Sequence, residues 1–187
     1  INMEQTGRTL KILVIGDSHG NISNLKHVLG FAKTIKVKAV IHTGDWNNVK
    51  SLATVINFNI PLYAVLGNAD IDPELSRKLK LFSKKFSEDF LKFEIDGAKI
   101  GVVHKFNNYK DNLHKLDVIF SGHYHSQLTK RYTDNEGNFY NMIQPGALEN
   151  GINFAVFDTK TNKVELINHD KIWSSTQSKR RNGKGWF

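Results

Sequence analysis

Short aliphatic runs alternate with amphipathic segments in the first third of the chain. The run from Lys11 to Ile15 ends at a glycine and predicts a buried strand, and apolar residues at helical spacing follow it. Two further runs, Ala39 to Ile41 and Leu62 to Leu66, also end at glycine turns. A helix is expected after the second run from the apolar positions Val49, Leu52, Ala53 and Ile56. Because a parallel return needs a dozen or more residues, this succession predicts parallel strands joined by right-handed crossovers.

The pattern changes from Phe90 onward, where short strands predominate. Phe90 to Ile95 alternates apolar and polar residues, and Asp96-Gly97 predicts a hairpin turn into a partner strand from Lys99 to Val103. Val118 to Ser121 predicts a buried strand, and a meander is expected after it, over Leu128 to Thr133, Asn138 to Ile143, Phe154 to Phe157 and Val164 to Ile167. We therefore expect an α/β fold with two mixed β-sheets packed face to face and flanked by helices.

The length of 187 residues suggests one domain, which we assign to residues 10–169, followed by a basic C-terminal tail over residues 170–187. Apolar residues make up 40% and charged residues 24%, which excludes disorder for most of the chain. No apolar run approaches the roughly 18 residues that cross a bilayer. Ile1 to Thr9 lacks the pattern of a secretory signal. We expect a cytoplasmic protein that does not contact a membrane.

The formal net charge is +8, from 26 basic and 18 acidic residues. Such a surplus favours phosphate-bearing partners through long-range attraction, or serves solubility alone. The expected tail carries five of the bases, Lys171, Lys179, Arg180, Arg181 and Lys184. We expect this segment to be mobile or to bind a partner, with nucleic acid as one candidate.

Asp, Asn and His residues gather directly after the predicted strands. There are seven such residues: Asp17, His19, Asp45, Asn68, His104, His123 and His125. Open α/β sheets collect their ligands outside the carboxyl ends of the strands, so we expect these side chains to share a site. Because the chain has no cysteine, a metal there would need His, Asp, Glu or Asn ligands.

These residue types predict a pair of divalent cations. In Asp17-x-His19 and His123-x-His125, the spacing of two places both side chains on one side of an extended segment. A carboxylate such as Asp45 can bridge two metals about 3.5–4 Å apart. The preceding glycines are expected to take positive φ values that turn the next side chain inward, at Gly16, Gly44, Gly67 and Gly122. Imidazole, carboxylate and amide donors suit Mn²⁺, our first choice, with Fe, Zn²⁺ and Ni²⁺ as alternatives.

The other four histidines are interpreted differently. His42 is close enough to Gly44-Asp45 to support a metal ligand from behind. His27, His114 and His169 are expected at structural or surface positions.

The chain resembles the calcineurin-like metallophosphoesterases, and within them the small single-domain phosphodiesterases of the YfcE type. The resemblance rests on Gly16-Asp17-Ser18-His19-Gly20-Asn21, Gly44-Asp45, Gly67-Asn68-Ala69-Asp70, His104, Gly122-His123-Tyr124-His125 and Pro145-Gly146. It implies a four-layer sandwich with one metal held by Asp17, His19, Asp45 and His125. It implies a second metal held by Asp45, Asn68, His104 and His123.

The resemblance implies a phosphodiesterase in which a hydroxide that bridges the two metals attacks phosphorus. We assign catalytic roles to Asp45, Asn68 and His104, and substrate binding to Asn21, Asp70 and Tyr124. Asp70 has a second interpretation, which we favour: it would cap a helix that begins near Pro73. The expected substrate is a small phosphodiester or a nucleotide. A nuclease and a non-catalytic scaffold like the retromer subunit of this fold are the alternatives, and a homodimer is one candidate assembly.

One departure from the family bears on chemistry. Ala69 stands where the family usually has His, or Cys in the small branch. In the larger phosphatases that His approaches the leaving group, so its absence predicts weak hydrolysis of monoesters. Tyr124 and Lys105 also replace smaller residues and are expected to reshape the mouth of the site.

Overall fold

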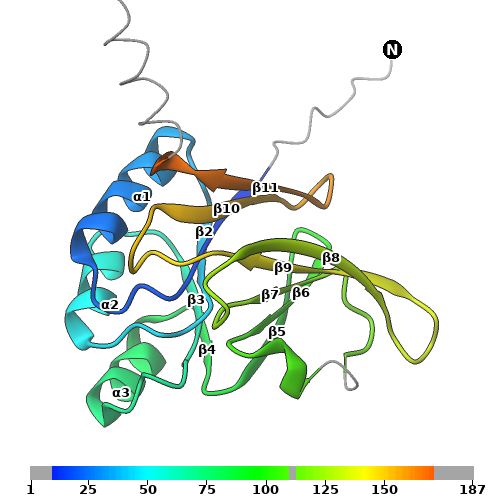
Figure 1. Cartoon of the computed structure of the whole chain (residues 1–187), viewed down its shortest axis with the longest axis horizontal. Helices are drawn as coiled ribbons and strands as arrows, with labels where there is room; N and C mark the ends of the chain where they lie inside the picture. The colour runs from blue at the N-terminus through cyan, green and yellow to red at the C-terminus, as the bar shows by residue number, and fades with distance from the viewer. Residues whose placement is uncertain (1–9, 110–112, 171–187) are drawn as a thin grey trace, which may run out of the picture.

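The computed structural model describes residues 10–109 and 113–170. Within these ranges eleven strands form two mixed sheets that pack face to face, and three α-helices cover the outer side of one sheet (Figure 1). The predicted fold class is confirmed. The 17 residues from 171 to 187, which contain the five bases of the expected tail, lie outside the described residues.

The larger sheet has six strands in the order β11-β10-β1-β2-β3-β4. Their bounds are Lys11–Ile15 for β1, Ala39–His42 for β2, Leu62–Val65 for β3, Lys85–Ser87 for β4, Asn153–Asp158 for β10 and Lys163–Asn168 for β11. β1, β2 and β3 run parallel, as the aliphatic runs predict, β4 is parallel to β3, and β10 and β11 are antiparallel to their neighbours. β4 was not expected, because its three residues contain no aliphatic run.

The smaller sheet has five strands in the order β5-β6-β7-β9-β8. Their bounds are Phe90–Ile95 for β5, Ala98–Val103 for β6, Val118–Ser121 for β7, Gln127–Thr133 for β8 and Phe139–Pro145 for β9. Asp96 and Gly97 join β5 to β6 with φ values of 53° and 83°. The predicted hairpin turn is therefore present, since a two-residue turn of this kind needs positive φ at both positions.

The expected meander is wrong. β8 and β9 form a hairpin in the smaller sheet, but β10 and β11 leave it and extend the larger one, with β10 antiparallel to β1. Phe154 to Phe157 are buried on both faces of β10, which requires a central position between two strands and between two apolar layers. The run of apolar residues predicts such a strand but does not select its sheet.

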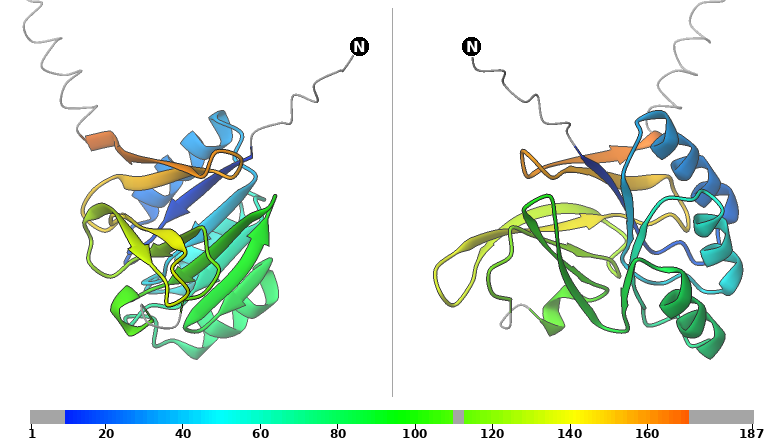
Figure 2. Two further views of the ribbon diagram at one scale, coloured as in Figure 1. Left: turned by 90° about the vertical axis from the view of Figure 1, so that its right-hand side faces the viewer. Right: turned by 180° about the vertical axis from the view of Figure 1, so that it is seen from behind.

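Three α-helices pack on the larger sheet: α1 over Ile22–Thr34, α2 over Val49–Ile56 and α3 over Pro73–Phe82 (Figure 2). α1 buries the four residues that its spacing predicts, and Asn21 caps it by accepting a hydrogen bond from Asn24 N. The buried face of α2 is rotated from the prediction, since Ala53 is exposed and Thr54 is buried. The Thr54 hydroxyl donates to the Lys50 carbonyl, which removes the cost of burying it.

The outer side of the smaller sheet has a different cover. A 3₁₀ helix, Phe106–Asn108, packs there with a small apolar cluster that includes Leu113, Leu116 and Tyr140. No α-helix of the described residues lies on this side (Figures 1 and 2). Among the described ranges, no helix has both the length and the apolar composition needed to cross a membrane.

The space between the sheets holds the core that fixes their separation. Phe157 from β10 and Phe120 from β7 are fully buried there, with ring centroids 5.5 Å apart. Apolar side chains of β1, β2, β6 and β9 surround this pair. The aromatic pair therefore joins the two sheets directly.

Replacing Phe157 with Ala should lower the free energy of unfolding by about 3–5 kcal/mol, because it leaves a cavity between the sheets. Phe139 is the matched control, since it is 61% exposed and Phe139→Ala should change the free energy by less than about 1 kcal/mol. Urea denaturation followed by circular dichroism measures both. Equal losses for the two variants would contradict the assigned core.

Candidate metal centre

All seven candidate ligands lie in loops just past the carboxyl ends of five strands. They follow β1, β2, β3, β6 and β7: Asp17 and His19, then Asp45, Asn68, His104, and finally His123 and His125. The strands come from both sheets, so the two loop sets meet at one end of the sandwich (Figure 1).

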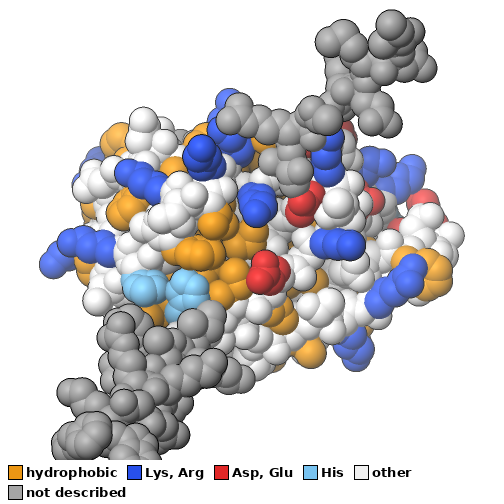
Figure 3. Space-filling model, turned by 90° about the horizontal axis from the view of Figure 1, so that it is seen from above, with side chains coloured by type: hydrophobic (Ala, Val, Ile, Leu, Met, Phe, Trp, Pro, Cys, Tyr) orange, Lys and Arg blue, Asp and Glu red, His pale blue; other side chains and the backbone are white. Residues whose placement is uncertain are grey.

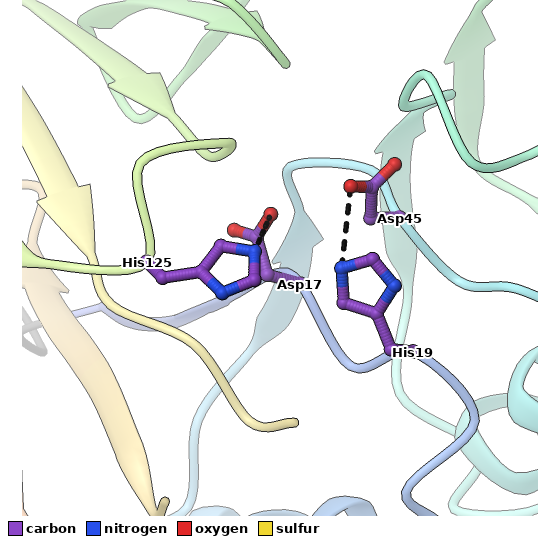
Figure 4. A group of neighbouring side chains, drawn as sticks. All are labelled: Asp17, His19, Asp45 and His125. Atoms are coloured by element: carbon purple, nitrogen blue, oxygen red, sulfur yellow. Dashed lines mark ion pairs between the residues drawn. The ribbon is translucent and has the colours of Figure 1, made fainter. Parts of the chain in front are cut away.

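The first group joins Asp17, His19, Asp45 and His125, whose ligand atoms all lie within 4.8 Å of one another. His19 Nε2 is 3.3 Å from Asp45 Oδ2, and His125 Nε2 is 3.5 Å from Asp17 Oδ1. Figure 4 shows the two imidazoles and two carboxylates pointing toward a common space. Two of these side chains follow β1 in sequence, and the other two come from β2 and from the smaller sheet.

The second group consists of Asp45, Asn68, His104 and His123. His104 Nε2 lies 3.4 Å from Asp45 Oδ2 and 2.9 Å from Asn68 Oδ1. His123 Nδ1 lies 2.9 Å from the same amide oxygen. Asp45 Oδ2 thus faces one histidine of each group, which is the position that a bridging carboxylate needs.

His104 provides a test of whether a cation fits. Its Nδ1 is 2.9 Å from the carbonyl oxygen of Thr43, which accepts a hydrogen bond, so Nδ1 carries the proton. Burial lowers the pKa of His104, so the ring is neutral and Nε2 has a bare lone pair. That lone pair faces the oxygens of Asn68 and Asp45. Such convergence is repulsive without a proton or a cation between the atoms.

The first group also has the arrangement that a cation would need. His19 Nε2 is buried and has no hydrogen-bond partner among the described residues, although Asp45 Oδ2 is close to it. Two ligands that each lie about 2.0–2.2 Å from one ion are roughly 3.0–3.5 Å apart. The separations of 3.3 and 3.5 Å in this group match that range. The residues therefore fit a divalent cation.

Burial dominates the electrostatics of Asp17. Desolvation raises the pKa of Asp17 to about 7, although His123 N donates to its carboxylate, and the nearby charge of Asp45 raises it further. Asp17 and Asp45 are almost fully buried close to one another. A divalent cation would favour the charged form of both carboxylates and reverse this shift.

Five of the seven candidate ligands adopt backbone conformations with positive φ. The positive φ values are 48° at Asp17, 41° at His19, 58° at Asp45, 73° at His123 and 55° at His125. Non-glycine residues seldom occupy this region, and such strain is concentrated at functional sites. The expectation of positive φ at the preceding glycines is correct only for Gly44, at 98°.

The other glycines are needed for close approach. A Cβ on Gly67 would lie 2.1 Å from Asp45 Oδ1, and one on Gly16 would lie 1.9 Å from Thr43 Oγ1. A Cβ on Gly122 would lie 2.8 Å from Asp17 Oδ2. The glycines thus let neighbouring loops touch, while the ligands make the turns.

His42 lies behind the ligands and joins two of their loops. Gly44 N donates to His42 Nδ1 over 3.2 Å, so the proton is on Nε2, which lies 3.2 Å from Ser18 Oγ. Burial holds the pKa of His42 well below its usual value, and its ring stacks on Trp46 at 3.5 Å. This neutral histidine fixes the Asp17–His19 loop against the Asp45 loop.

Sequence reasoning missed two residues of the site. The Thr43 carbonyl orients His104, and Glu149 Oε2 lies 3.6 Å from His125 Nδ1. Thr43 acts through its backbone, which any residue type could supply. Glu149 follows β9 without a regular spacing from the other candidates, so neither leaves a signal in the sequence.

Two of the three residues assigned to substrate binding have hydrogen-bond partners within the fold. Asn21 caps α1 and donates to the Glu149 carbonyl. Asp70 accepts hydrogen bonds from Gly67 N and Asn47 N, both at 2.8 Å, and burial raises its pKa. The cap interpretation of Asp70 is wrong, because Asp72 caps α3 by accepting from Glu74 N.

The third residue, Tyr124, is 40% exposed beside the candidate ligand His123. Its ring meets the His123 ring edge-on at 5.1 Å. A cavity of about 290 Å³ opens beside the second group, with Asn68, His104 and His123 in its wall. Lys105 and Tyr109 line the same cavity. A small ester could therefore reach the ligand atoms.

Basic side chains are spread over the surface instead of forming one stripe on the face that Figure 3 shows. Acidic side chains are interspersed with them on that face. The surplus of +8 therefore gives this face no single anion-binding patch.

Comparisons with known proteins agree with this architecture. A phosphodiesterase of Methanocaldococcus jannaschii is 27% identical over 136 residues, which cover 67% of this chain and 79% of the relative. The solved structure of a novel archaeal phosphodiesterase has a TM-score of 0.70 at 22% identity and covers 85% of this chain and 99% of its own. Yfce, a phosphoesterase from E. coli, has a TM-score of 0.60 at 15% identity, with coverage of 85% and 99%.

Both solved structures share the fold of this chain. The family model for the calcineurin-like phosphoesterase superfamily domain matches residues 10–162, which include all seven candidate ligands. A match over this length, together with the shared fold, shows that the chain belongs to the calcineurin-like phosphoesterase superfamily.

Proposed function

We propose that the chain is a metal-dependent phosphodiesterase with two divalent cations, Mn²⁺ being our first choice. The observation that carries the proposal is the position of Asp45, whose Oδ2 faces His19 of one ligand group and His104 of the other. One cation would be held by Asp17, His19, Asp45 and His125. The second would be held by Asp45, Asn68, His104 and His123. The names of the phosphodiesterase relatives agree with this substrate class.

When bound, such a pair of cations supplies a nucleophilic water of lowered pKa and neutralises charge on the phosphoryl oxygens. Hydrogen bonds within the chain orient the candidate ligands for this role. Thr43 keeps His104 Nε2 free of a proton, and the His123 amide holds the Asp17 carboxylate in place. Ala69 N donates to Asp45 Oδ1 over 2.9 Å, which fixes the carboxylate while Oδ2 faces the histidines.

The cavity beside the second group is the proposed entrance for the ester. Lys105 lines it directly after His104 and offers a positive charge to a phosphate. The volume of this cavity, about 290 Å³, is at the small end of the range for ligand pockets, which favours a small diester as the substrate. A cytoplasmic location remains part of the proposal.

Turnover of bis(p-nitrophenyl) phosphate with added Mn²⁺ tests the function. We expect release of nitrophenolate that stops with a chelator and returns with the metal. A nuclease would instead cleave single-stranded DNA faster than the aryl diester. A scaffold would bind metal without turning over either compound.

Asp45→Asn should remove at least one of the two metals, because an amide cannot bridge two cations as a carboxylate does. Turnover should fall by roughly a hundredfold or more, since metal stabilisation of the transition state is worth several kcal/mol. Metal content by plasma mass spectrometry and turnover of the aryl diester are the measurements. An unchanged metal content would contradict the bridging role.

His125→Ala should lower activity far more than His27→Ala. His125 faces Asp17 in the first group, whereas His27 is exposed on α1 and pairs with His169 over 2.9 Å. The comparison is matched, because each change removes one imidazole from a partly or fully exposed position. Steady-state kinetics at saturating Mn²⁺ measures both, and a comparable loss at His27 would show that the strand-end assignment is wrong.

Ala69→His should raise hydrolysis of p-nitrophenyl phosphate relative to bis(p-nitrophenyl) phosphate. A methyl group neither donates a proton to the leaving group nor offsets its charge. An imidazole does both, and the rate of monoester hydrolysis should rise by at most about a hundredfold. Kinetics on this monoester and diester give the ratio. A shift toward the diester would show that position 69 does not face the leaving group.

A further inference from the structure

A second groove lies on the outer side of the smaller sheet, where no α-helix of the described chain covers it. Its volume is about 310 Å³, and we call it the outer groove. It is lined by Phe106 and Asn107 of the 3₁₀ helix, by Tyr124, by Leu128 and Lys130 of β8, and by Gln144 of β9, among others. The β8–β9 hairpin that forms one wall projects from the body of the molecule (Figures 1 and 2).

The outer groove begins at the candidate metal centre. Tyr124 lies between the two ligands His123 and His125, and its ring packs edge-on against the His123 ring at 5.1 Å. The ring also lines the outer groove. A group that is attached to a phosphate at the metals could therefore extend past His123 onto Tyr124.

Apolar and aromatic surface makes up much of the groove. Leu128 is 41% exposed and Tyr124 is 40% exposed, both high values for large apolar side chains. Phe106 and Tyr132 form a tilted ring pair at 4.9 Å behind them. Such a surface binds flat rings well, because aromatic faces stack on any nucleobase.

The polar groups of the groove point to a ring that carries donors and acceptors. Asn107 Nδ2 donates to Tyr124 Oη over 2.9 Å, so the amide oxygen of Asn107 and the hydroxyl proton of Tyr124 are left for a ligand. Gln144 is only 5% exposed, and its Oε1 accepts from Ser126 Oγ, so its amide contributes donors. Amides of this kind pair with the edges of nucleobases.

The groove also contains a cation. Lys130 Nζ lies 5.1 Å from the centre of the Tyr132 ring, and no acid is among the residues that line the groove. A lysine beside a stacking surface complements the phosphate of a nucleotide. An aliphatic chain in the same place would leave the amides and the lysine without partners.

We propose that the outer groove binds a nucleobase next to the scissile phosphate, so that the preferred substrates are phosphodiesters of nucleosides. The proposal rests on the function proposed above and specifies its substrate class. The retained or the leaving alcohol would then be a nucleoside, with its base against Tyr124 and Leu128 and a neighbouring phosphate near Lys130.

The test compares two diesters that release the same nitrophenolate. One is the p-nitrophenyl ester of thymidine 5′-phosphate, and the other is methyl p-nitrophenyl phosphate, which has no base. We expect wild type to favour the thymidine ester in kcat/KM by roughly tenfold or more, the range that stacking of one base supplies. Leu128→Asp should reduce this preference severalfold and leave turnover of the methyl ester unchanged. Lys130→Ala should leave both rates unchanged, because neither diester carries a second phosphate.

Arg131→Ala is the matched control. Arg131 follows Lys130 on the exposed strand β8 but points to its other face, where it lies over Phe139 at 4.0 Å. The control removes the same charge one residue away, so it should leave the binding of an oligonucleotide with neighbouring phosphates unchanged, whereas Lys130→Ala should weaken that binding. An equal loss of binding in Lys130→Ala and Arg131→Ala would show a general charge effect and overturn the groove.

A binding measurement separates this proposal from the proposed function. Fluorescence anisotropy with a fluorescein-labelled tetrathymidylate of phosphorothioate linkages reports binding without hydrolysis. Binding should weaken severalfold in Lys130→Ala and Leu128→Asp but not in Arg131→Ala. Suppose that the methyl ester is turned over, but that neither the preference for the thymidine ester nor the binding of tetrathymidylate depends on these residues. The proposal that the outer groove binds a nucleobase is then overturned, while the proposed phosphodiesterase function stands.

Two other outcomes are equally decisive. If neither diester is hydrolysed but tetrathymidylate binding depends on Lys130 and Leu128, the groove stands and the proposed function fails. If Leu128→Asp instead dissociates a dimer in analytical ultracentrifugation and binding is unaffected, the groove is a contact between two copies of the chain. That result would overturn the nucleobase proposal.

Discussion

The Asp45 carboxylate holds the candidate site together. Its Oδ1 accepts from Ala69 N in the loop after β3, and its Oδ2 faces His19 after β1 and His104 after β6. The backbone carbonyl of Asp45 accepts from His19 N as well. Loops from both sheets therefore meet at one buried negative charge, which is unfavourable unless positive charge compensates for it. The histidines that converge on it are placed to hold a divalent cation, which would compensate this charge.

Support for this charge extends well beyond the ligands. Five ligands occupy strained positive φ values, and glycines let the loops approach within distances that a Cβ would prevent. Behind them, neutral His42 joins the Ser18 and Gly44 segments, and the sheets are fixed by the core around Phe120 and Phe157. The packed interior thus stabilises conformations that the loops would not adopt alone.

The two sheets differ in how they are covered, and this difference shapes the surface around the site. All three α-helices of the described residues lie on the larger sheet, so the smaller sheet keeps an open outer side. Tyr124 belongs to the ligand loop and to that open side at once. The candidate metal centre therefore has surface on two sides, a cavity lined by Lys105 and an aromatic groove lined by Lys130.

The sequence alone is enough to predict most elements and the list of candidate ligands. The aliphatic runs before Gly16, Gly44 and Gly67 became β1, β2 and β3, each with candidate ligands after its carboxyl end, since the apolar pattern that predicts a buried strand is local in the chain. It did not select the sheet for β10, because a strand buried on both faces fits any central position. Contacts between distant parts of the chain determine which candidate ligands share Asp45, that Asp70 joins two loops, and that Thr43 orients His104. Those contacts join residues from 23 to 61 positions apart or involve backbone atoms, and neither leaves a periodic pattern in the chain.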